Sequence, residues 1–114
     1  LYDYPASQAA LAQVREDRYP VAERFELYIG GMEIANGFQE LTNAGLQRKR
    51  FNEDNRRRGS SRQAEVPMDE ALLDALVAGM PECSGVALGL DRLLMVLTGT
   101  HDIRQVVTFD IGRA

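Results

Sequence analysis

Two glutamates, Glu26 and Glu33, lie on either side of the Gly30-Gly31 pair. Glycine permits the positive φ angles of a tight turn, so residues 24–29 and 32–41 are expected to form an antiparallel hairpin. Side chains alternate along a strand, and in this hairpin both glutamates lie on one face as diagonal neighbours, roughly 7–8 Å apart at the backbone. Two carboxylates this close repel each other unless a cation lies between them.

Magnesium suits such a pair because Mg²⁺ prefers hard oxygen ligands and often combines one or two carboxylates with the phosphates of a substrate. The hairpin therefore predicts a metal and phosphate site at Glu26 and Glu33. The alternative is the solvent-exposed face of a half-buried sheet, where acidic side chains are common. The spacing alone leaves both interpretations open.

The returning strand contains a conflict in side-chain direction. A two-residue turn pairs Glu26 with Ala35, and strict alternation then directs the polar residues after Glu33 to the opposite face. One shared site requires the alternation to slip near residues 35–37, where Gly37 would suit a β-bulge. The residues that this slip would add to the site are Asn36, Phe38 and Glu40.

A second constellation is the run of small residues from Ser84 to Leu88, followed by Gly89 and Arg92. The run predicts a strand that leads directly into a helix, and its glycines would let a flat ligand approach the backbone closely. An arginine in the first helical turn lies near the end of that strand, where its planar guanidinium can meet phosphate oxygens or stack on a base. The alternative is a turn whose glycines serve packing.

The elements that must position these residues are a hairpin, two helices, a short strand and a further helix, which together predict an α+β fold: an antiparallel sheet flanked by helices. Residues 43 to about 58 read as a polar helix, and Asp69 caps a second helix that Gly79 ends. The second helix would bury one face made of Leu72, Leu73, Leu76 and Val77. The other expected elements are a short helix over Ser7–Val14, a helix over Leu93–Leu97 that ends at Gly99, and a last strand over Val106–Phe109.

The composition fits one globular domain, since the chain has 114 residues, 45% of them hydrophobic and 26% charged. The formal net charge of −4 is unevenly distributed. Residues 46–63 contain seven basic and two acidic side chains, a net of +5, so the remainder carries −9. This cluster predicts either a solvated helix face or an RNA-binding surface, and the latter would make the chain a non-catalytic binding module.

Cysteine and histidine each occur once, as Cys83 and His101. A zinc site or a histidine-based catalytic triad is therefore not expected. The lone cysteine cannot form an internal disulfide and suits a reducing cytoplasm. Every apolar run is shorter than the roughly 20 residues that span a bilayer, so no membrane association is expected.

Taken together, these motifs resemble the latter half of the catalytic domain of class II lysyl-tRNA synthetases. The matching stretches are residues 24–28 (RFELY), residues 33–41 (EIANGFQEL) and residues 89–92 (GLDR), the last being the third signature motif of that class. They occur in order and extend over essentially the whole chain. Residues 1–114 are therefore expected to form the C-terminal portion of such a domain.

The resemblance implies ATP and Mg²⁺ as cofactors. Glu26 and Glu33 resemble the carboxylates that hold magnesium on the ATP phosphates. Gly89 resembles part of the adenine floor. Arg92 resembles the arginine that stacks on adenine and reaches the terminal phosphates.

On the substrate side, Asn36 and Phe38 resemble residues that line the amino-acid pocket, and Glu40 resembles the acid that receives the distal ammonium group of lysine. The implied reaction is attack of the substrate carboxylate on the α-phosphate, which yields an acyl-adenylate and pyrophosphate. Catalysis would depend on positioning and charge neutralisation, chiefly by Glu33 and Arg92, with no protein nucleophile.

Some features resemble one branch, the elongation factor P–lysine ligases, which are paralogues of lysyl-tRNA synthetases. Ala87 stands where lysyl-tRNA synthetases usually have glycine, and residues 5–12 and 80–85 also resemble this branch. The branch implies activation of (R)-β-lysine and its transfer to a lysine of elongation factor P. A methyl group at Ala87 would narrow the pocket wall and shift discrimination by about 1–3 kcal/mol. Simple packing drift at this position, and a lysyl-tRNA synthetase that charges tRNA with lysine, are the alternatives.

Two earlier signature motifs of the class, which form the dimer and bind the α-phosphate, are not found within residues 1–114. The chain is therefore expected to contain a partial site, to have little activity alone and to expose a sheet edge. Its parent protein is expected to be a homodimer.

Overall fold

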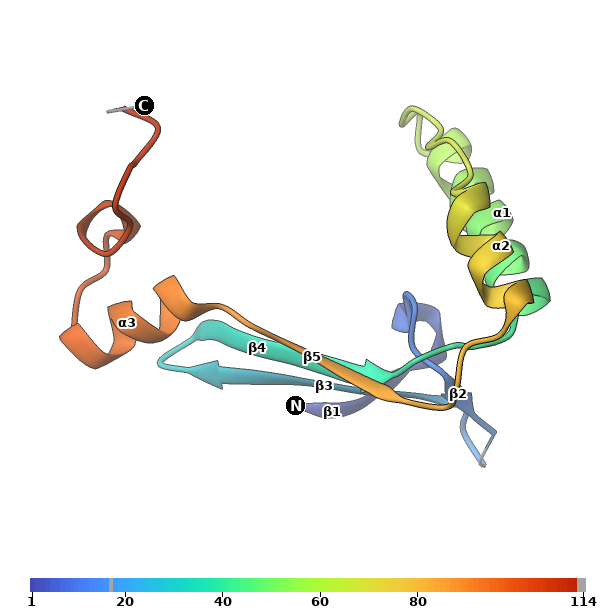
Figure 1. The fold of residues 1–114 in the computed structure, drawn as a ribbon, viewed down its shortest axis with the longest axis horizontal. Helices are drawn as coiled ribbons and strands as arrows, with labels where there is room; N and C mark the ends of the chain where they lie inside the picture. The colour runs from blue at the N-terminus through green and yellow to red at the C-terminus, as the bar shows by residue number, and fades with distance from the viewer. Residues whose placement is uncertain (17, 113–114) are drawn as a thin grey trace.

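A five-stranded antiparallel sheet forms the centre of the molecule in a computed structural model that describes residues 1–16 and 18–112 (Figure 1). The strands follow the order β1-β3-β4-β5, and β2 also pairs with β3. Their bounds are β1 Tyr2–Pro5, β2 Val14–Arg15, β3 Val21–Ile29, β4 Met32–Gln39 and β5 Ser84–Leu88. Because β5 is the last strand of this order, it forms an edge of the described sheet.

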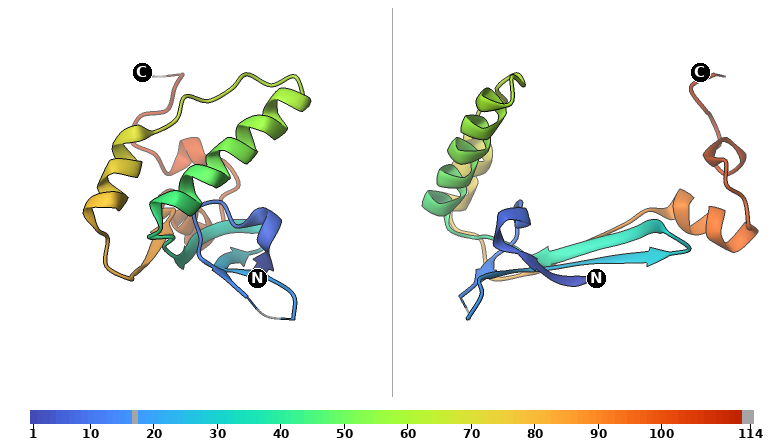
Figure 2. Two further views of the ribbon diagram at one scale, coloured as in Figure 1. Left: turned by 90° about the vertical axis from the view of Figure 1, so that its right-hand side faces the viewer. Right: turned by 180° about the vertical axis from the view of Figure 1, so that it is seen from behind.

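The helices lie at the two ends of the sheet (Figures 1 and 2). At one end, α1 (Ala44–Ser60) and α2 (Glu70–Ala78) form a two-helix arm, and at the other end α3 (Leu90–Thr98) follows β5. Two 3-10 turns complete the fold, η1 (Ala6–Gln8) and η2 (Ile103–Gln105). The radius of gyration is 17.4 Å, against about 13 Å for a compact chain of this length. The predicted α+β architecture is confirmed, in an elongated shape.

Local signals begin and end the helices where the sequence predicts. The side chain of Asn43 accepts a hydrogen bond from the Leu46 amide, and that of Asp69 accepts one from the Leu72 amide, so both act as N-caps. Gly99 ends α3 in the left-handed conformation. The first helix extends through Gly59 to Ser60, slightly beyond the expected break.

The hairpin turn has the predicted geometry, with φ angles of 57° at Gly30 and 82° at Gly31. Next to the turn, Tyr28 pairs with Glu33, but Leu27 then pairs with Ala35, so the register shifts by one residue. The extra residue of β4 is Ile34. A β-bulge of this kind reverses the facing of every later side chain on the bulged strand.

The predicted slip is therefore present, but not at the predicted position. It lies at Ile34, and Gly37 belongs to a regular ladder with both neighbouring strands. The expected pairing of Glu26 with Ala35 is wrong, because the bulge brings Asn36 opposite Glu26.

Gly37 has a packing role. A Cβ atom at this position would lie 2.6 Å from the Phe25 ring and 2.8 Å from the Gly85 carbonyl oxygen, both too close for any side chain. Glycine is therefore required here by the close approach of β3, β4 and β5.

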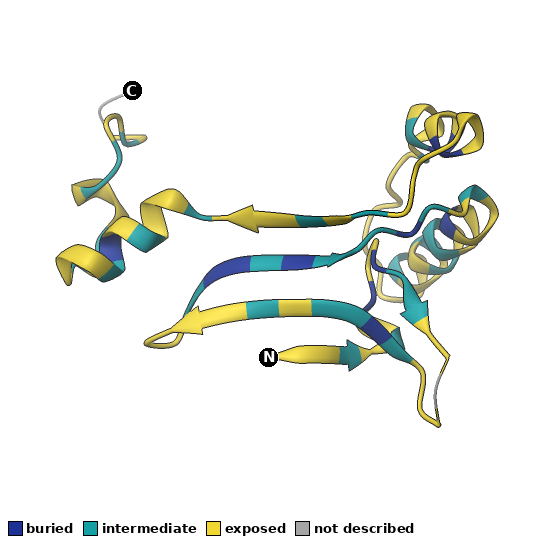
Figure 3. Ribbon diagram, turned by 60° about the horizontal axis from the view of Figure 1, so that its bottom comes forward, coloured by how far each residue is buried: buried dark blue, intermediate teal, exposed yellow. Residues whose placement is uncertain are grey.

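The two faces of the sheet differ in character. On one face, strand alternation gathers the polar residues of the predicted site. The other face is apolar and largely exposed, with Leu27 48% and Val86 66% accessible. Most of β5 is drawn as exposed in Figure 3. A small core of Ala9, Ala12 and Ala22 lies where the first residues cross the sheet.

Three expectations about local structure are wrong. Residues 7–14 do not form a helix beyond the η1 turn, because Ala9 and Ala12 are buried in the core and Ala12 bridges to Glu40. Residues 106–109 form turns and bends rather than a strand, since no described strand pairs with them. In α2, Leu73 and Leu76 are buried but Val77 is 76% exposed, so the apolar face is narrower than predicted. Among the described residues no helix is long and apolar enough to cross a membrane.

Candidate functional site

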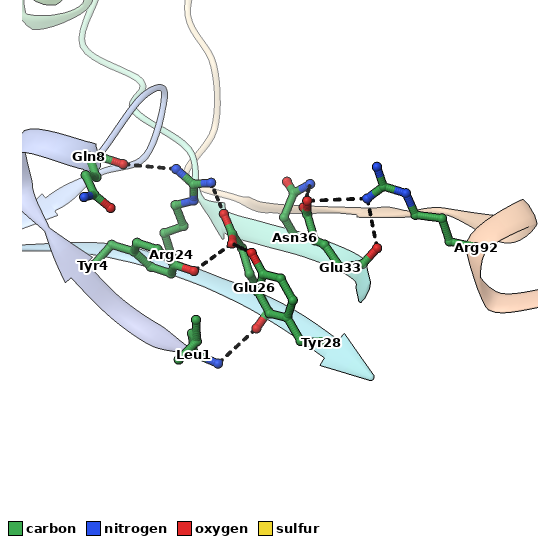
Figure 4. Close-up of polar contacts among 9 residues, drawn as sticks. All are labelled: Leu1, Tyr4, Gln8, Arg24, Glu26, Tyr28, Glu33, Asn36 and Arg92. Atoms are coloured by element: carbon green, nitrogen blue, oxygen red, sulfur yellow. Dashed lines mark hydrogen bonds and ion pairs between the residues drawn. The ribbon is translucent and has the colours of Figure 1, made fainter. Parts of the chain in front are cut away.

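The bulge at Ile34 assembles one polar face from two strands. Asn36 lies directly opposite Glu26, and Glu33 lies opposite Tyr28, so all four side chains share this face (Figure 4). The predicted grouping of Glu26 with Glu33 and Asn36 is therefore present. It depends on the extra residue, because a regular ladder would direct Asn36 away from Glu33.

Glu26 is the centre of a hydrogen-bond network. Its Oε2 accepts the hydroxyl groups of Tyr4, at 2.7 Å, and of Tyr28, at 2.6 Å. Its Oε1 accepts a close charge-assisted hydrogen bond from Arg24. The side chain is only 11% exposed, so this carboxylate is well enclosed by its partners (Figure 4).

These contacts favour the ionised form of Glu26. The hydrogen bonds from Tyr28 and then Tyr4 lower the pKa of the Glu26 carboxyl, with the Arg24 charge acting in the same direction. The reciprocal effect raises the pKa of Tyr28 to about 12, mainly through its hydrogen bond to Glu26. Burial, followed by the hydrogen bond to Glu26, raises the pKa of Tyr4. Both phenols therefore remain neutral donors.

Arg24 connects this network to the start of the chain. It donates to the Gln8 carbonyl oxygen at 3.0 Å, and its guanidinium lies 4.9 Å from the centre of the Tyr4 ring. Its Nε is buried and has no hydrogen-bond partner. Arg24 thus holds η1, Tyr4 and Glu26 together.

Glu33 is less enclosed than Glu26, with 33% of its side chain exposed. Asn36 donates to Glu33 Oε1 at 3.3 Å. Arg92, from the first turn of α3, donates to the Glu33 backbone carbonyl at 2.9 Å and lies 3.5 Å from Oε2. The two catalytic candidates Glu33 and Arg92 are therefore neighbours, although 59 residues separate them in the chain.

The bulge also fixes the glycine corner that follows β5. The Gly89 amide donates to the Ile34 carbonyl oxygen at 2.8 Å, so the extra residue of β4 is bonded to the residue before α3. A Cβ atom at Gly89 would meet its nearest neighbours at an ordinary 3.5 Å. The chain itself therefore does not require glycine at this position.

A cavity of about 630 Å³ lies between the hairpin and α3. Glu33 and Arg92, the two catalytic candidates, both line it. The sequence interpretation missed two further lining residues, His101 and Asp102, because only the fold returns the segment after α3 to the hairpin. The remaining lining residues are Tyr28, Gly31, Met32, Met95 and Ile103.

The candidate substrate residues lie on the neighbouring strands. Ala87 is directly opposite Asn36 across the β4–β5 pair, on the polar face. The Glu40 carboxylate lies over Gly85, since a Cβ atom at Gly85 would be 2.8 Å from Glu40 Oε1. The Glu40 amide donates to the Cys83 carbonyl at 2.9 Å, which fixes its backbone.

Phe38 has a structural contact that the sequence interpretation did not include. It pairs with Gly85 on the polar face and packs against the small core of Ala9, Ala12 and Ala22. As a wall of the proposed amino-acid pocket, Phe38 would be held in place by this packing.

Most arginines of the basic cluster, residues 46–63, form hydrogen bonds within the molecule. Arg48 forms a two-bond fork with Glu70 of α2, at 2.9 and 2.6 Å, and Arg58 donates to the Ala64 carbonyl oxygen. Arg56 and Arg57 share the Glu53 carboxylate, and Arg50 donates to two backbone carbonyls of the segment after η1. These contacts favour the interpretation of the cluster as a solvated helix face.

Protein side chains alone do not make a complete metal centre here. No group of three or more histidine, cysteine or acidic residues comes together in residues 1–16 and 18–112. Glu26 and Glu33 offer hard oxygen ligands, the type that Mg²⁺ prefers, and they fit a cation that takes its other ligands from phosphates and water.

Comparison with known families agrees with this arrangement. Residues 1–112 match the model of the class II tRNA synthetases of the D, K and N group, and the chain belongs to this family. Among individual proteins, it is 52% identical over 114 residues to elongation factor P–(R)-β-lysine ligases of Salmonella dublin, Salmonella paratyphi B and Salmonella heidelberg. The alignments cover 100% of this chain and 35% of each relative, so the chain spans about a third of their length. The family match therefore assigns residues 1–112 to a class II tRNA synthetase domain.

Proposed function

We propose that the full-length protein activates (R)-β-lysine with ATP and transfers it to a lysine side chain of elongation factor P. The observation that carries this proposal is the position of Ala87. Its methyl group lies directly opposite Asn36 on the polar face, where it would narrow the amino-acid pocket. The name of the relatives supports the same substrate and acceptor.

On the nucleotide side, Glu33 and Glu26 would hold Mg²⁺ together with the phosphates of ATP. The bound cation would supply charge neutralisation on the phosphates. Arg92 is already directed toward Glu33 and the cavity, where its guanidinium can meet phosphate oxygens or stack on adenine. Gly89 suits the close approach of a base, because nothing in the chain itself requires glycine there.

On the amino-acid side, Glu40 would receive the distal ammonium of the substrate in a charge-assisted hydrogen bond. Its carboxylate lies over Gly85, two residues before Ala87 on the same face of β5. Asn36 and Phe38 would form the adjacent wall. A substrate that reaches from Glu40 past Ala87 would then approach the nucleotide with its carboxylate end.

In the proposed reaction, a carboxylate oxygen of the substrate attacks the α-phosphorus of ATP, and pyrophosphate leaves. The ε-amino group of a lysine on elongation factor P then attacks the acyl carbon, loses a proton and releases AMP. The residues of this chain position the reactants and neutralise charge, without forming a covalent bond. The chain would supply part of the site in a homodimeric parent. The cytoplasmic location expected from the single cysteine stays a prediction.

The test is pyrophosphate exchange by the full-length protein with α-lysine and (R)-β-lysine as alternative substrates. We expect a clear preference for (R)-β-lysine. Ala87→Gly should reduce that preference about 10-fold or more, since one methyl group contributes about 1–3 kcal/mol of discrimination. A preference for α-lysine in the unaltered protein would overturn the proposal.

A second candidate is a tRNA-charging lysyl enzyme, which the family match favours because the family includes such synthetases. It would use the same candidate residues at the nucleotide. Transfer of labelled lysine to tRNA, but not to elongation factor P, would establish this alternative. The RNA-binding module has less support, because the arginines on which it would depend are engaged within the arm.

A further inference from the structure

One of the two candidate metal ligands is already nearly saturated by protein donors. A carboxylate has about four acceptor positions, two on each oxygen. On Glu26, the hydroxyls of Tyr4 and Tyr28 occupy both positions of Oε2, and Arg24 occupies one position of Oε1. A single position on Oε1 is left for a ligand.

Glu33 has weaker contacts with protein donors than Glu26 has. Its contact with Asn36 is long, at 3.3 Å, and its contact with Arg92 through Oε2 is at the 3.5 Å limit of hydrogen bonding. Its side chain is also three times as exposed as that of Glu26. Glu33 can therefore turn both oxygens toward a cation, whereas Glu26 cannot.

We propose that Tyr4 and Tyr28 are positioning residues for the divalent cation, which hold Glu26 so that it offers only Oε1 and leave Glu33 as the principal metal ligand. This inference rests on the proposed function, because it assumes a cation on this face. The two phenols come from different strands, β1 and β3, so they hold Oε2 from two independent anchors.

The chemistry of the donors suits this task. A phenol is neutral, so it fixes an acidic ligand without adding a positive charge that would repel the cation. Tyr4 is itself held in place, since its ring packs on the small core and lies beneath the Arg24 guanidinium. Groups that orient a metal ligand in this way typically change metal affinity by about 10–100-fold when removed.

The experiment measures the binding of Mn²⁺, as a probe for Mg²⁺, to the full-length protein with a non-hydrolysable ATP analogue. Affinity for the analogue is determined with and without Mn²⁺ by calorimetry. We expect Tyr4→Phe and Tyr28→Phe each to reduce the gain in affinity from Mn²⁺ about tenfold. Binding of the metal-free analogue should not change, which separates positioning from a general structural effect. Tyr2→Phe is the matched control, because Tyr2 lies on the same strand as Tyr4 and is 80% exposed.

The variants Glu26→Gln and Glu33→Gln separate this inference from the function on which it rests. If both retain the full Mn²⁺ effect, the proposed metal site is wrong. If Glu33→Gln removes the effect but the tyrosine variants behave like Tyr2→Phe, only the positioning inference is wrong. If either tyrosine variant fails to fold, a crystal structure of the unaltered protein with Mn²⁺ and the analogue decides the question. A metal bound through Glu26 Oε2 would overturn the inference. A metal bound through Glu33 and Glu26 Oε1 would support it.

Discussion

The hairpin of β3 and β4 and the arm of α1 and α2 both contain charged side chains, but these side chains find their partners in different ways. The glutamates of the hairpin find their partners across long separations in sequence: Tyr4 and Glu26 are 22 residues apart, and Glu33 and Arg92 are 59 apart. In the arm, Arg56 and Arg57 pair with Glu53 within one turn of the same helix.

A segment rich in charged residues is therefore a poor guide to a functional site. Exposed ion pairs along a helix contribute little and need no ligand to explain them. The hairpin holds two carboxylates on one partly enclosed face, which is costly unless a cation or a set of donors compensates them. The scarcer charges of the hairpin are therefore better candidates for chemistry than the conspicuous arginines.

The strongest test of the comparison is removal of the charge of Glu33 in the hairpin or of Arg92, its neighbour in α3. In the full-length protein, Glu33→Gln and Arg92→Ala should each reduce pyrophosphate exchange about 100-fold or more, because each would remove a group that stabilises charge on the phosphates. The measurement is the exchange rate at saturating ATP and substrate. Activity within a few-fold of the unaltered protein would show that these residues are not at the reacting phosphates.

Glycine-to-alanine substitutions should change the free energy of unfolding differently in the hairpin and in the arm. Gly37→Ala should lower the free energy of unfolding by about 1–3 kcal/mol, because its methyl group would overlap the Phe25 ring and the Gly85 carbonyl. Gly59→Ala in the arm is the control: no atom lies within 4 Å of its Cβ position, and alanine favours the helix by about 0.5–1 kcal/mol. Urea unfolding of both variants in the full-length protein measures the difference, and equal effects would contradict the packing described for the hairpin.

Acid should affect the hairpin through Glu26. Its pKa in the folded protein is lowered from 4.5, so its stabilisation is fully present above pH 4.5 and is lost as the pH falls through the folded-state value. Glu26→Gln removes this titration. The free energy of unfolding between about pH 3 and 6 should therefore depend less on pH in the variant than in the unaltered protein. Parallel curves would show that the carboxylate gains nothing from its partners.

Base should affect the same network through Tyr28. Its pKa is raised from 10.0 to about 12, so its stabilisation is present below pH 10 and is lost as the pH rises through 12. Absorbance titration of tyrosinate should contain one late-titrating group that is missing from Tyr28→Phe. A difference spectrum that titrates near pH 10 would contradict the hydrogen bond to Glu26.

The smallest effect is expected in the arm. Joint replacement of Arg56, Arg57 and Arg58 by glutamine should leave pyrophosphate exchange nearly unchanged, because their partners lie within the arm and its loop. RNA affinity, measured at two salt concentrations, should also be unaffected. A loss of salt-dependent RNA binding would restore the nucleic-acid interpretation of the cluster.

Prediction from sequence succeeds here where the information is local. The Gly30-Gly31 turn, the start of α1 next to Asn43, the cap at Asp69 and the end of α3 at Gly99 depend on a few adjacent residues, and all are confirmed. It fails for residues 7–14 and 106–109, because burial against another strand, or the lack of a strand partner, overrides local preference.

By itself, the sequence determined the residue types of the site, the family resemblance and the need for a slip in the second strand. It could not locate that slip, because the residue left unpaired depends on which amide and carbonyl groups find partners in the whole sheet. Only the tertiary structure decided that Ile34 is the extra residue, bonded through its carbonyl to Gly89. The bulge places Asn36 opposite Glu26, and the contact from Ile34 to Gly89 holds the start of α3, with Arg92, near Glu33.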